Sequence, residues 1–220
     1  MKKLILILLL FVSANFAQTS TILLLFDDAG SMPITFTGTS TGNITLQGTG
    51  VIVVDWGDGS KNSYTLTGSD QNISHNYGSA GTRNIKIDKP KLITKWRQSD
   101  ATNTWAWDTK YLPNLTYLHL ESIKGAMVVN TANITSLTYL SLYNLNTGTI
   151  SITVNTANIT SLTFLYLNSL NTGTISITVN TANITSLTSL ALHNLNTGTI
   201  SITVNTANIT SLTFLYLNSL

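Results

Sequence analysis

The second half of this chain repeats itself with a fixed period. The segment NTGTISITVNTANITSLT occurs three times without a change, beginning at Asn146, Asn171 and Asn196, so the period is 25 residues. Shorter and degenerate copies begin at Asn130 and at Leu112. A period of roughly 20–50 residues is typical of a solenoid, in which similar units stack on one another. Such scaffolds commonly bind partners or act as spacers, so the repeats favour a binding or structural function over a catalytic one.

The repeats differ almost only in one short window. It reads YLSLYN in the first copy, FLYLNS in the second and fourth, and SLALHN in the third. Alternate side chains of a strand point to opposite faces, so we expect the constant leucines to face inward and the variable residues outward. Stacking then places the variable residues in three columns: Tyr117, Tyr139, Phe164, Ser189 and Phe214; His119, Ser141, Tyr166, Ala191 and Tyr216; and Glu121, Tyr143, Asn168, His193 and Asn218.

These columns are the candidate binding surface, because exposed aromatic side chains are costly without a purpose. The alternative is recent duplication followed by drift, since residues 146–170 and 196–220 are identical. The candidate binding residues are the aromatic and histidine members of the columns: Tyr117, His119, Tyr139, Tyr143, Phe164, Tyr166, His193, Phe214 and Tyr216.

The leucine spacing L-x-x-L-x-L-x-x-L, seen at Leu162, Leu165, Leu167 and Leu170, resembles the leucine-rich repeat. The resemblance covers residues 112–220. It is incomplete at the position three residues after the third leucine, where the family has Asn or Cys. This chain has leucine there, and Asn follows one position later. The rest of each unit, TISITV, alternates polar and apolar residues and predicts a second strand. We therefore expect two strands and no helix per 25-residue repeat, and a plain parallel β-solenoid is the alternative.

The repeats carry almost no charge. From Gly125 to Leu220 there is no Asp, Glu, Lys or Arg, so Thr, Ser and Asn must solvate the surface. The chain stops in the middle of a unit without a polar capping segment, although solenoids need one to cover their last apolar layer. We therefore expect a fragment, or a protein from which later repeats are missing.

Residues 1–17 have the order of a secretory signal peptide: Lys2 and Lys3, an apolar run from Leu4 to Val12, and small residues near Ala17. A membrane anchor is the alternative, but the apolar run is too short to span a bilayer. The chain contains no Cys, which excludes disulfides and lipid attachment through a thiol. Residues 18–32 are assigned to a linker or strand.

Residues 33–90 read as short strands between Gly-rich turns, the pattern of a small β-sandwich. The strongest signal is VVDWGDGS from Val53, followed by SHNYGSAGTRNIKI from Ser74. This combination resembles the PKD domain, an immunoglobulin-like sandwich, with Trp56 in place of the usual Phe and expected in the core. Asp55 and Asp58 are oxygen donors that suit Ca²⁺, but Asp in such turns commonly bonds nearby backbone amides. We favour that structural role for both, and a packed or hydrogen-bonded role for His75.

Residues 91–111 form the expected junction and N-terminal cap of the solenoid, with Trp96, Trp105 and Trp107 stacked on its open end. The alternative for these three residues is a platform for carbohydrate. A linear cluster of cations lies between Arg83 and Arg97, and we expect most of it to be a solvated face at the domain junction, with an anionic glycan or a lipid headgroup as the alternative partner.

The predicted class is an all-β protein: a small PKD-like β-sandwich followed by a leucine-rich-repeat solenoid over residues 112–220. Neither paired carboxylates nor a phosphate-binding loop can be placed, so we expect no enzyme and no cofactor. Without the signal peptide the formal charge falls from +2 to zero, which makes nucleic acid an unsuitable partner. The combination resembles bacterial cell-surface and adhesin-like proteins, and this implies a secreted or surface-bound binding protein for a protein or glycan, without a transmembrane segment in the mature chain.

Two other functions remain open at this point. A structural stalk would use the identical repeats only to set length. An ice-binding surface would use the hydroxyl groups of the second strand, with Thr149, Ser151 and Thr153 stacked on Thr174, Ser176 and Thr178 and on Thr199, Ser201 and Thr203.

Overall fold

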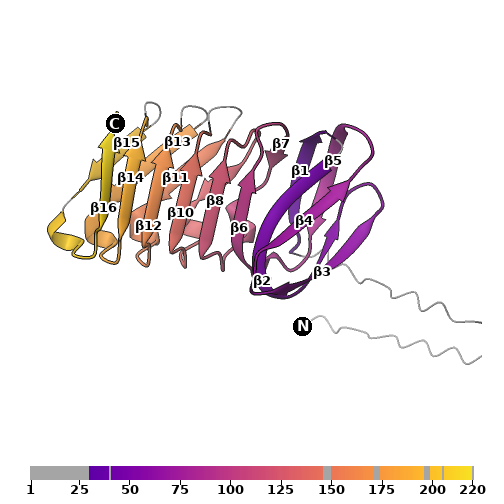
Figure 1. The fold of residues 1–220 in the computed structure, drawn as a ribbon, viewed down its shortest axis with the longest axis horizontal. Coiled ribbons are helices and arrows are strands. Elements are labelled where there is room, and N and C mark those ends of the chain that lie inside the picture. Colours follow the sequence, from indigo (N-terminus) through magenta and orange to yellow (C-terminus); the bar gives the residue numbers. More distant parts are fainter. Residues whose placement is uncertain are drawn as a thin grey trace, which may run out of the picture.

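The computed structural model describes residues 30–39, 41–145, 150–170, 174–195, 199–204 and 206–219. Within these ranges the chain forms strands and short 3₁₀ turns, and no α-helix (Figure 1). The predicted signal peptide, most of the 18–32 linker and the three Asn residues at 146, 171 and 196 lie outside the described residues.

The strands fall into an N-terminal group and a repeating group. The N-terminal group comprises β1 (Met32–Gly38), β2 (Thr41–Asp55), β3 (Lys61–Thr67), β4 (Gln71–Asn76), β5 (Gly81–Ile87), β6 (Ile93–Ser99) and β7 (Thr104–Ala106). The repeating group comprises β8 (Tyr117–Glu121), β9 (Val128–Asn130), β10 (Tyr139–Tyr143), β11 (Ser151–Asn155), β12 (Phe164–Asn168), β13 (Thr174–Asn180), β14 (Ser189–His193), β15 (Thr199–Thr203) and β16 (Phe214–Asn218). The 3₁₀ turns are η1 (Pro90–Leu92), η2 (Thr109–Tyr111), η3 (Thr131–Asn133), η4 (Thr156–Asn158), η5 (Thr181–Asn183) and η6 (Thr206–Asn208).

The N-terminal strands form a sandwich built around one long strand. The sequence predicts two strands at 43–46 and 51–56, whereas the structure has the single strand β2. Its first half pairs with β4 and β6, and its second half pairs with β3 and β5. The register shifts between Gln47 and Gly48, where a side chain in place of the glycine hydrogen would collide with the carbonyl of Leu92. Trp56 is completely buried in the core, as predicted.

The sheet of the sandwich continues into the solenoid without a break. Strand β6 is antiparallel to β2 on one side and parallel to β8 on the other. The first strand of the parallel stack therefore lies inside the 91–111 segment, one coil earlier than the leucine pattern predicts. The reason is that Trp96 and Gln98 occupy the inward positions that leucines hold in later coils, and both are buried.

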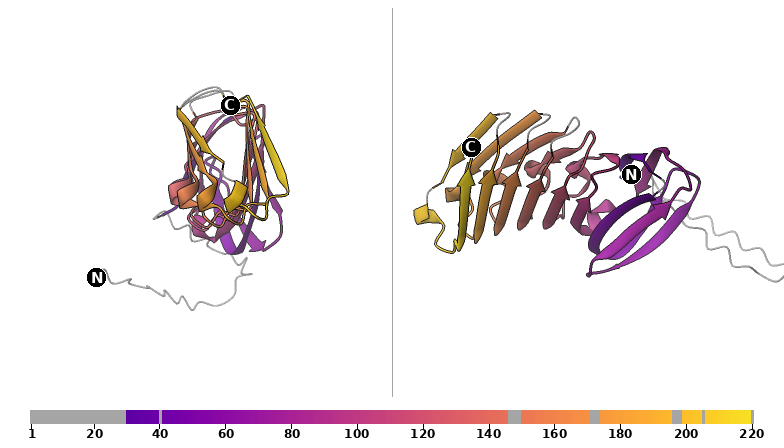
Figure 2. Two further views of the ribbon diagram at one scale, coloured as in Figure 1. Left: turned by 90° about the vertical axis from the view of Figure 1, so that its left-hand side faces the viewer. Right: turned by 45° about the horizontal axis from the view of Figure 1, so that its top comes forward.

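The repeats form a β-solenoid-like stack with two strands per 25-residue unit. The strands β8, β10, β12, β14 and β16 extend the long sheet, and β9, β11, β13 and β15 form a parallel sheet on the opposite wall (Figure 2). The inward leucines of β10, β12 and β14 have no exposed surface, and Ile150, Ile152 and Val154 are equally buried on the other wall. The predicted inward and outward alternation is confirmed for these coils. In β16, by contrast, Leu215 and Leu217 remain 44% and 41% exposed.

Threonine hydroxyls connect successive coils at two corners. At one corner the buried Thr131 Oγ1 accepts a hydrogen bond from the backbone N–H of Asn155 and donates to its carbonyl, at 3.0 and 3.2 Å. Thr156 repeats both bonds with Asn180. At the other corner each Thr donates to the carbonyl of the Thr one coil earlier: Thr116, Thr138, Thr163, Thr188 and Thr213. Buried backbone groups are thus satisfied without charge.

Candidate binding face

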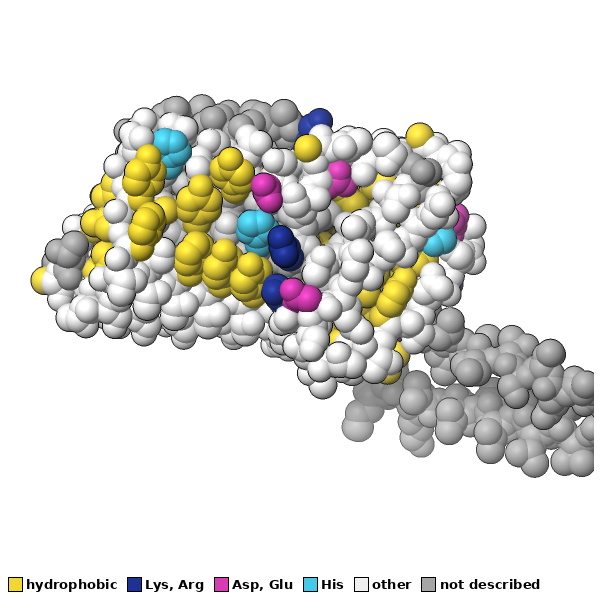
Figure 3. All heavy atoms as spheres, viewed as in Figure 1, with side chains coloured by type: hydrophobic (Ala, Val, Ile, Leu, Met, Phe, Trp, Pro, Cys, Tyr) yellow, Lys and Arg dark blue, Asp and Glu magenta, His cyan; other side chains and the backbone are white. Residues whose placement is uncertain are grey.

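The outward columns predicted from the sequence form on the long sheet. Tyr117, Tyr139, Phe164, Ser189 and Phe214 are direct neighbours in the parallel register, and so are the members of the other two columns. Figure 3 shows these hydrophobic side chains as rows that run across one face of the molecule. The nine candidate residues therefore share one surface, which we call the aromatic face.

The first three members of the first column form a ring stack, which ends at Phe164 because Ser189 is the next member. The rings of Tyr117 and Tyr139 lie 4.1 Å apart with an interplanar angle of 9°, and those of Tyr139 and Phe164 lie 4.3 Å apart at 3°. The strand spacing of about 4.8 Å imposes this close, parallel arrangement. The ammonium group of Lys95 covers the first ring at 4.4 Å, a favourable cation–π geometry. The inner ring faces are therefore occupied, and the stack presents mainly ring edges and hydroxyl groups to a partner.

The other two columns are more open. The rings of Tyr143 and Tyr166 are tilted at 6.0 Å, and those of His193 and Tyr216 at 5.5 Å. The hydroxyl of Tyr166 accepts a hydrogen bond from the side-chain amide of Asn168. Not every outward position is accessible: Ser141 and Ala191 are only 2% and 3% exposed. Large residues therefore alternate with small, covered ones along the second column.

Two ionisable groups on this face, Tyr139 and His119, favour their neutral forms. Burial raises the pKa of Tyr139 to about 12, with a further contribution from the hydrogen bond to Tyr117, so its phenol is protonated near neutral pH. Burial also lowers the pKa of His119 below 6.5, and the positive charges of Arg97 and Lys95 add to this in spite of Glu121. The Nε2 atom of His119 lies 3.6 Å from Glu121. The imidazole is therefore mainly neutral at pH 7.

Sequence analysis missed two members of this face, Lys95 and Arg97. They point outward from β6 beside Tyr117 and His119. Lys95 precedes Tyr117 by the same 22 positions by which Tyr117 precedes Tyr139 (117 − 95 and 139 − 117). A search of the sequence for alternating inward and outward residues, with inward residues other than leucine allowed, would have found this earlier coil. The linear cation cluster does not form one patch, because Arg83 and Lys86 belong to β5, which pairs with a different part of β2.

The opposite wall does not form the predicted hydroxyl array. The sequence predicts that like residues stack at an interval of 25, but the parallel register of β11, β13 and β15 has an interval of 23. Thr153 therefore lies beside Ser176, and Ser176 beside Thr199. Asn155 lies beside Thr178, and Thr178 beside Ser201. The strands of this wall run obliquely to the stacking direction, so identical side chains are displaced along the sheet. Thr149 lies outside the described residues.

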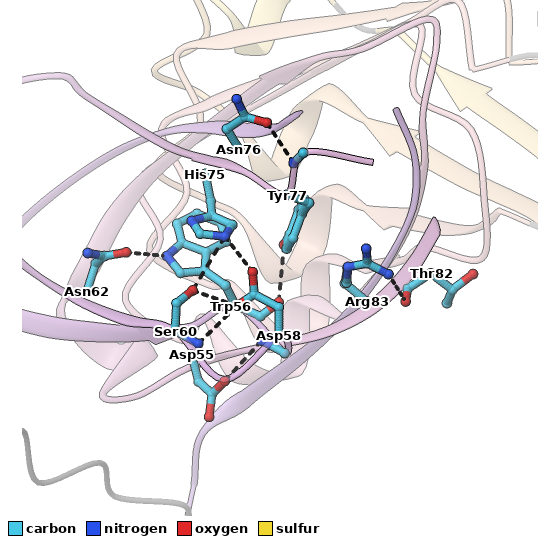
Figure 4. A network of polar contacts seen from close by, with 12 residues as sticks. Asp55, Trp56, Asp58, Ser60, Asn62, His75, Asn76, Tyr77, Thr82 and Arg83 are labelled. Atoms are coloured by element: carbon cyan, nitrogen blue, oxygen red, sulfur yellow. Dashed lines mark hydrogen bonds and ion pairs between the residues drawn. The ribbon is translucent and has the colours of Figure 1, made fainter. Parts of the chain in front are cut away.

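The turn after β2 is held by protein contacts (Figure 4). The Asp55 carboxylate accepts from the N–H of Gly57 and pairs with Lys61, and the Asp58 carboxylate accepts from the N–H of Ser60. The Nε2 atom of His75 lies 2.7 Å from Asp58, and its ring stacks on Trp56 at 5.0 Å. Hydrogen bonds from Ser60, followed by the contact with His75, hold the pKa of Asp58 well below its usual range. These are the structural roles that the sequence indicates.

The three junction tryptophans are buried, as a cap requires. Trp96 and Trp105 have no exposed surface and Trp107 has 3%. The indole N–H groups of Trp96 and Trp107 both donate to Oε1 of Gln98, and Trp105 donates to Asp100. Buried rings cannot present a platform to a carbohydrate, so that alternative is wrong for these residues.

Comparison with known proteins identifies no relative: no family, no curated protein and no solved structure matches this chain. Among the described residues, no helix is long and apolar enough to cross a membrane. No group of three or more potential metal ligands occurs within the same part of the chain. The class that the fold defines is thus a β-rich, solenoid-like protein with an aromatic outer face.

Proposed function

We propose that this chain is an exported, non-catalytic surface protein that binds a protein or glycan through its aromatic face. The observation that carries the proposal is the position of the sequence variation. Otherwise identical repeats differ at the outward positions of β10, β12, β14 and β16, where aromatic side chains gather over a single sheet. A surface that served only to solvate the coils would have no need of these rings.

We also propose that the coils are leucine-rich repeats and that the sandwich is a PKD-like module that holds them away from an anchoring point. The leucine spacing and the Trp56–Gly57–Asp58–Gly59 turn with His75 and Tyr77 support these assignments. Localisation outside a bacterial cell rests on the signal-peptide pattern of residues 1–17. Mass spectrometry of the exported protein should then find a new N-terminus between residues 15 and 20, and a retained Met1 would contradict export.

The stalk is the second candidate, and the ring stack favours it. Three rings in close parallel contact stabilise the coils and have little free face for a ligand. The oblique register of the opposite wall, which mixes Thr, Ser and Asn in one column, argues against an ice-binding surface.

A comparison of two faces tests the binding proposal. Replacing Tyr143, Tyr166 and Tyr216 by Ser removes rings that lie outside the close stack, so the circular dichroism of the β-sheets should persist. Retention on host-cell and glycan arrays should fall by at least tenfold. The matched control replaces the exposed Thr174 and Thr199 of the opposite wall by Lys and should bind like the parent. Loss of binding in the Lys variant alone would place the binding site on the wall opposite the aromatic face and would contradict the proposal. If neither the parent nor any variant is retained on the arrays, the stalk function is favoured over the binding function.

A further inference from the structure

A polar pocket lies at the end of the aromatic face, where the sandwich meets the solenoid. It has a volume of about 300 Å³ and is bordered by β2, β4 and β6. Its lining is made of amide and hydroxyl side chains around one guanidinium group: Asn43, Thr45, Asn72, Arg97 and Ser99, with Gln98 between the last two. Arg97 is a direct strand neighbour of both Thr45 and His119, so the pocket is continuous with the second aromatic column.

The cation in this pocket is not neutralised by the protein. Lys95, two residues away, forms an ion pair with Asp70 at 2.9 Å, and Glu121 lies against His119. Arg97 is exposed and has neither an ion pair nor a hydrogen bond within the described part of the chain. Beyond Lys124 the sequence of the solenoid has no charged side chain at all. Among the residues that line the pocket, Arg97 is the only charged one.

We propose that the pocket binds an acidic glycan, with a sugar carboxylate on Arg97. The planar guanidinium presents two parallel N–H groups that match the two oxygens of a carboxylate. The amides of Asn43 and Asn72 and the hydroxyls of Thr45 and Ser99 both donate and accept, as sugar hydroxyl groups do. The pocket has the size of a small-ligand site. The glycan chain then continues over His119 towards Tyr166.

The same lining disfavours a folded protein as the occupant of this pocket. Protein interfaces are anchored by large apolar or aromatic side chains in desolvated pockets, and no lining residue here is apolar. A nucleic acid needs several cations along its backbone, whereas this pocket contains one. The inference rests on the proposed binding function and adds to it the class of ligand and the residue that selects it.

The test measures binding of the full chain to immobilised polygalacturonate, dextran sulfate and neutral dextran. Arg97→Gln should weaken binding to polygalacturonate roughly 10- to 100-fold, the usual effect of losing hydrogen bonds to a charged group. Arg97→Lys keeps the charge but loses the paired N–H groups, so it should recover only part of the affinity. Lys91→Gln removes the same charge from an exposed side chain outside the pocket and is the matched control. Circular dichroism should be identical for all variants.

The outcomes separate this inference from the proposed function. If Arg97→Gln and Lys91→Gln bind polygalacturonate equally well, the pocket is not the site and the inference is wrong. The inference is also wrong if dextran sulfate binds and polygalacturonate does not, or if the parent prefers a neutral glycan or a protein. In those cases the proposed function stands as long as the Tyr143, Tyr166 and Tyr216 substitutions abolish binding. No binding to any array or polysaccharide would overturn both.

Discussion

The sandwich and the solenoid use aromatic and polar side chains in opposite ways. In the sandwich, Trp56, Phe36 and Trp105 are buried in the core, and ionised groups such as Asp58 and Lys61 hold the turns. In the solenoid the core is leucine and isoleucine, the rings lie outside, and uncharged Thr and Asn hold the corners. The difference follows from repetition: identical coils would bring like charges within about 4.8 Å of each other in a column, whereas identical rings and hydroxyls attract one another.

The largest expected effect of a single substitution lies in the sandwich. Trp56→Ala removes a buried ring that stacks on His75 and whose indole N–H donates to Asn62 at 2.8 Å. We expect a loss of about 3–5 kcal/mol in the free energy of unfolding, measured by chemical denaturation. Tyr143→Ala on the outside of the solenoid is the control and should cost far less. If both variants lose the same free energy of unfolding, the aromatic side chains of the sandwich core and of the solenoid surface do not differ in their contribution to stability.

A smaller effect is expected at the uncharged corners of the solenoid. Thr156→Val keeps the shape of the side chain but leaves the N–H and carbonyl of Asn180 without their buried partner. The expected loss is about 1–3 kcal/mol. Thr163→Val removes a hydroxyl that donates to Thr138 from an exposed residue, where water can replace it, and should be nearly neutral. If the exposed variant is the less stable one, the buried ladder is not what joins the coils.

The smallest effect is confined to acidic solution and to the sandwich. The folded-state pKa of Asp58 is lowered, mainly by hydrogen bonds from Ser60. Its contribution to stability is therefore complete above the unfolded value of 3.8 and is lost as the pH falls below it towards the folded pKa. Asp58→Asn should flatten the pH dependence of the melting temperature below pH 4. The solenoid has no acidic group after Glu121, so a solenoid-specific probe should show little change. An unchanged slope in the variant would assign the acid sensitivity to another carboxylate.

The repeats show how much of the fold and the site the sequence predicts. Because the leucines of this strand must face the core in every copy, the residues between them point outward, and the sequence predicts their three columns. The period alone does not determine which residues become neighbours, since the opposite wall shares the period but pairs at an interval of 23. The function of the columns does not follow, because stacking occupies the ring faces of Tyr117, Tyr139 and Phe164. That property depends on side-chain orientation, about which a period says nothing.

The first strand of the solenoid shows where prediction from the sequence ends. In β6, Trp96 and Gln98 stand where later coils have leucine, so the leucine pattern does not mark Lys95 and Arg97 as part of the aromatic face. Likewise, the sequence predicts a break between strands at 43–46 and 51–56, but the chain continues through a bulge at Gln47 and Gly48 because β6 and β3 supply partners on either side of it. Local turn preference is weak compared with the hydrogen bonds of two sheets.

By itself, the sequence predicted the all-β class of fold, the inward leucines, the buried Trp56 and the bonds from Asp55 and Asp58 to nearby backbone amides. Each of these depends on alternation or on contacts within a few residues. Only the tertiary structure decided that one sheet runs through both halves, that the hydroxyl wall is oblique, and that Arg97 borders a pocket beside the rings. These properties depend on which strands become neighbours across long stretches of chain. Pairing of that kind is set by the packing of the whole molecule rather than by any segment of it.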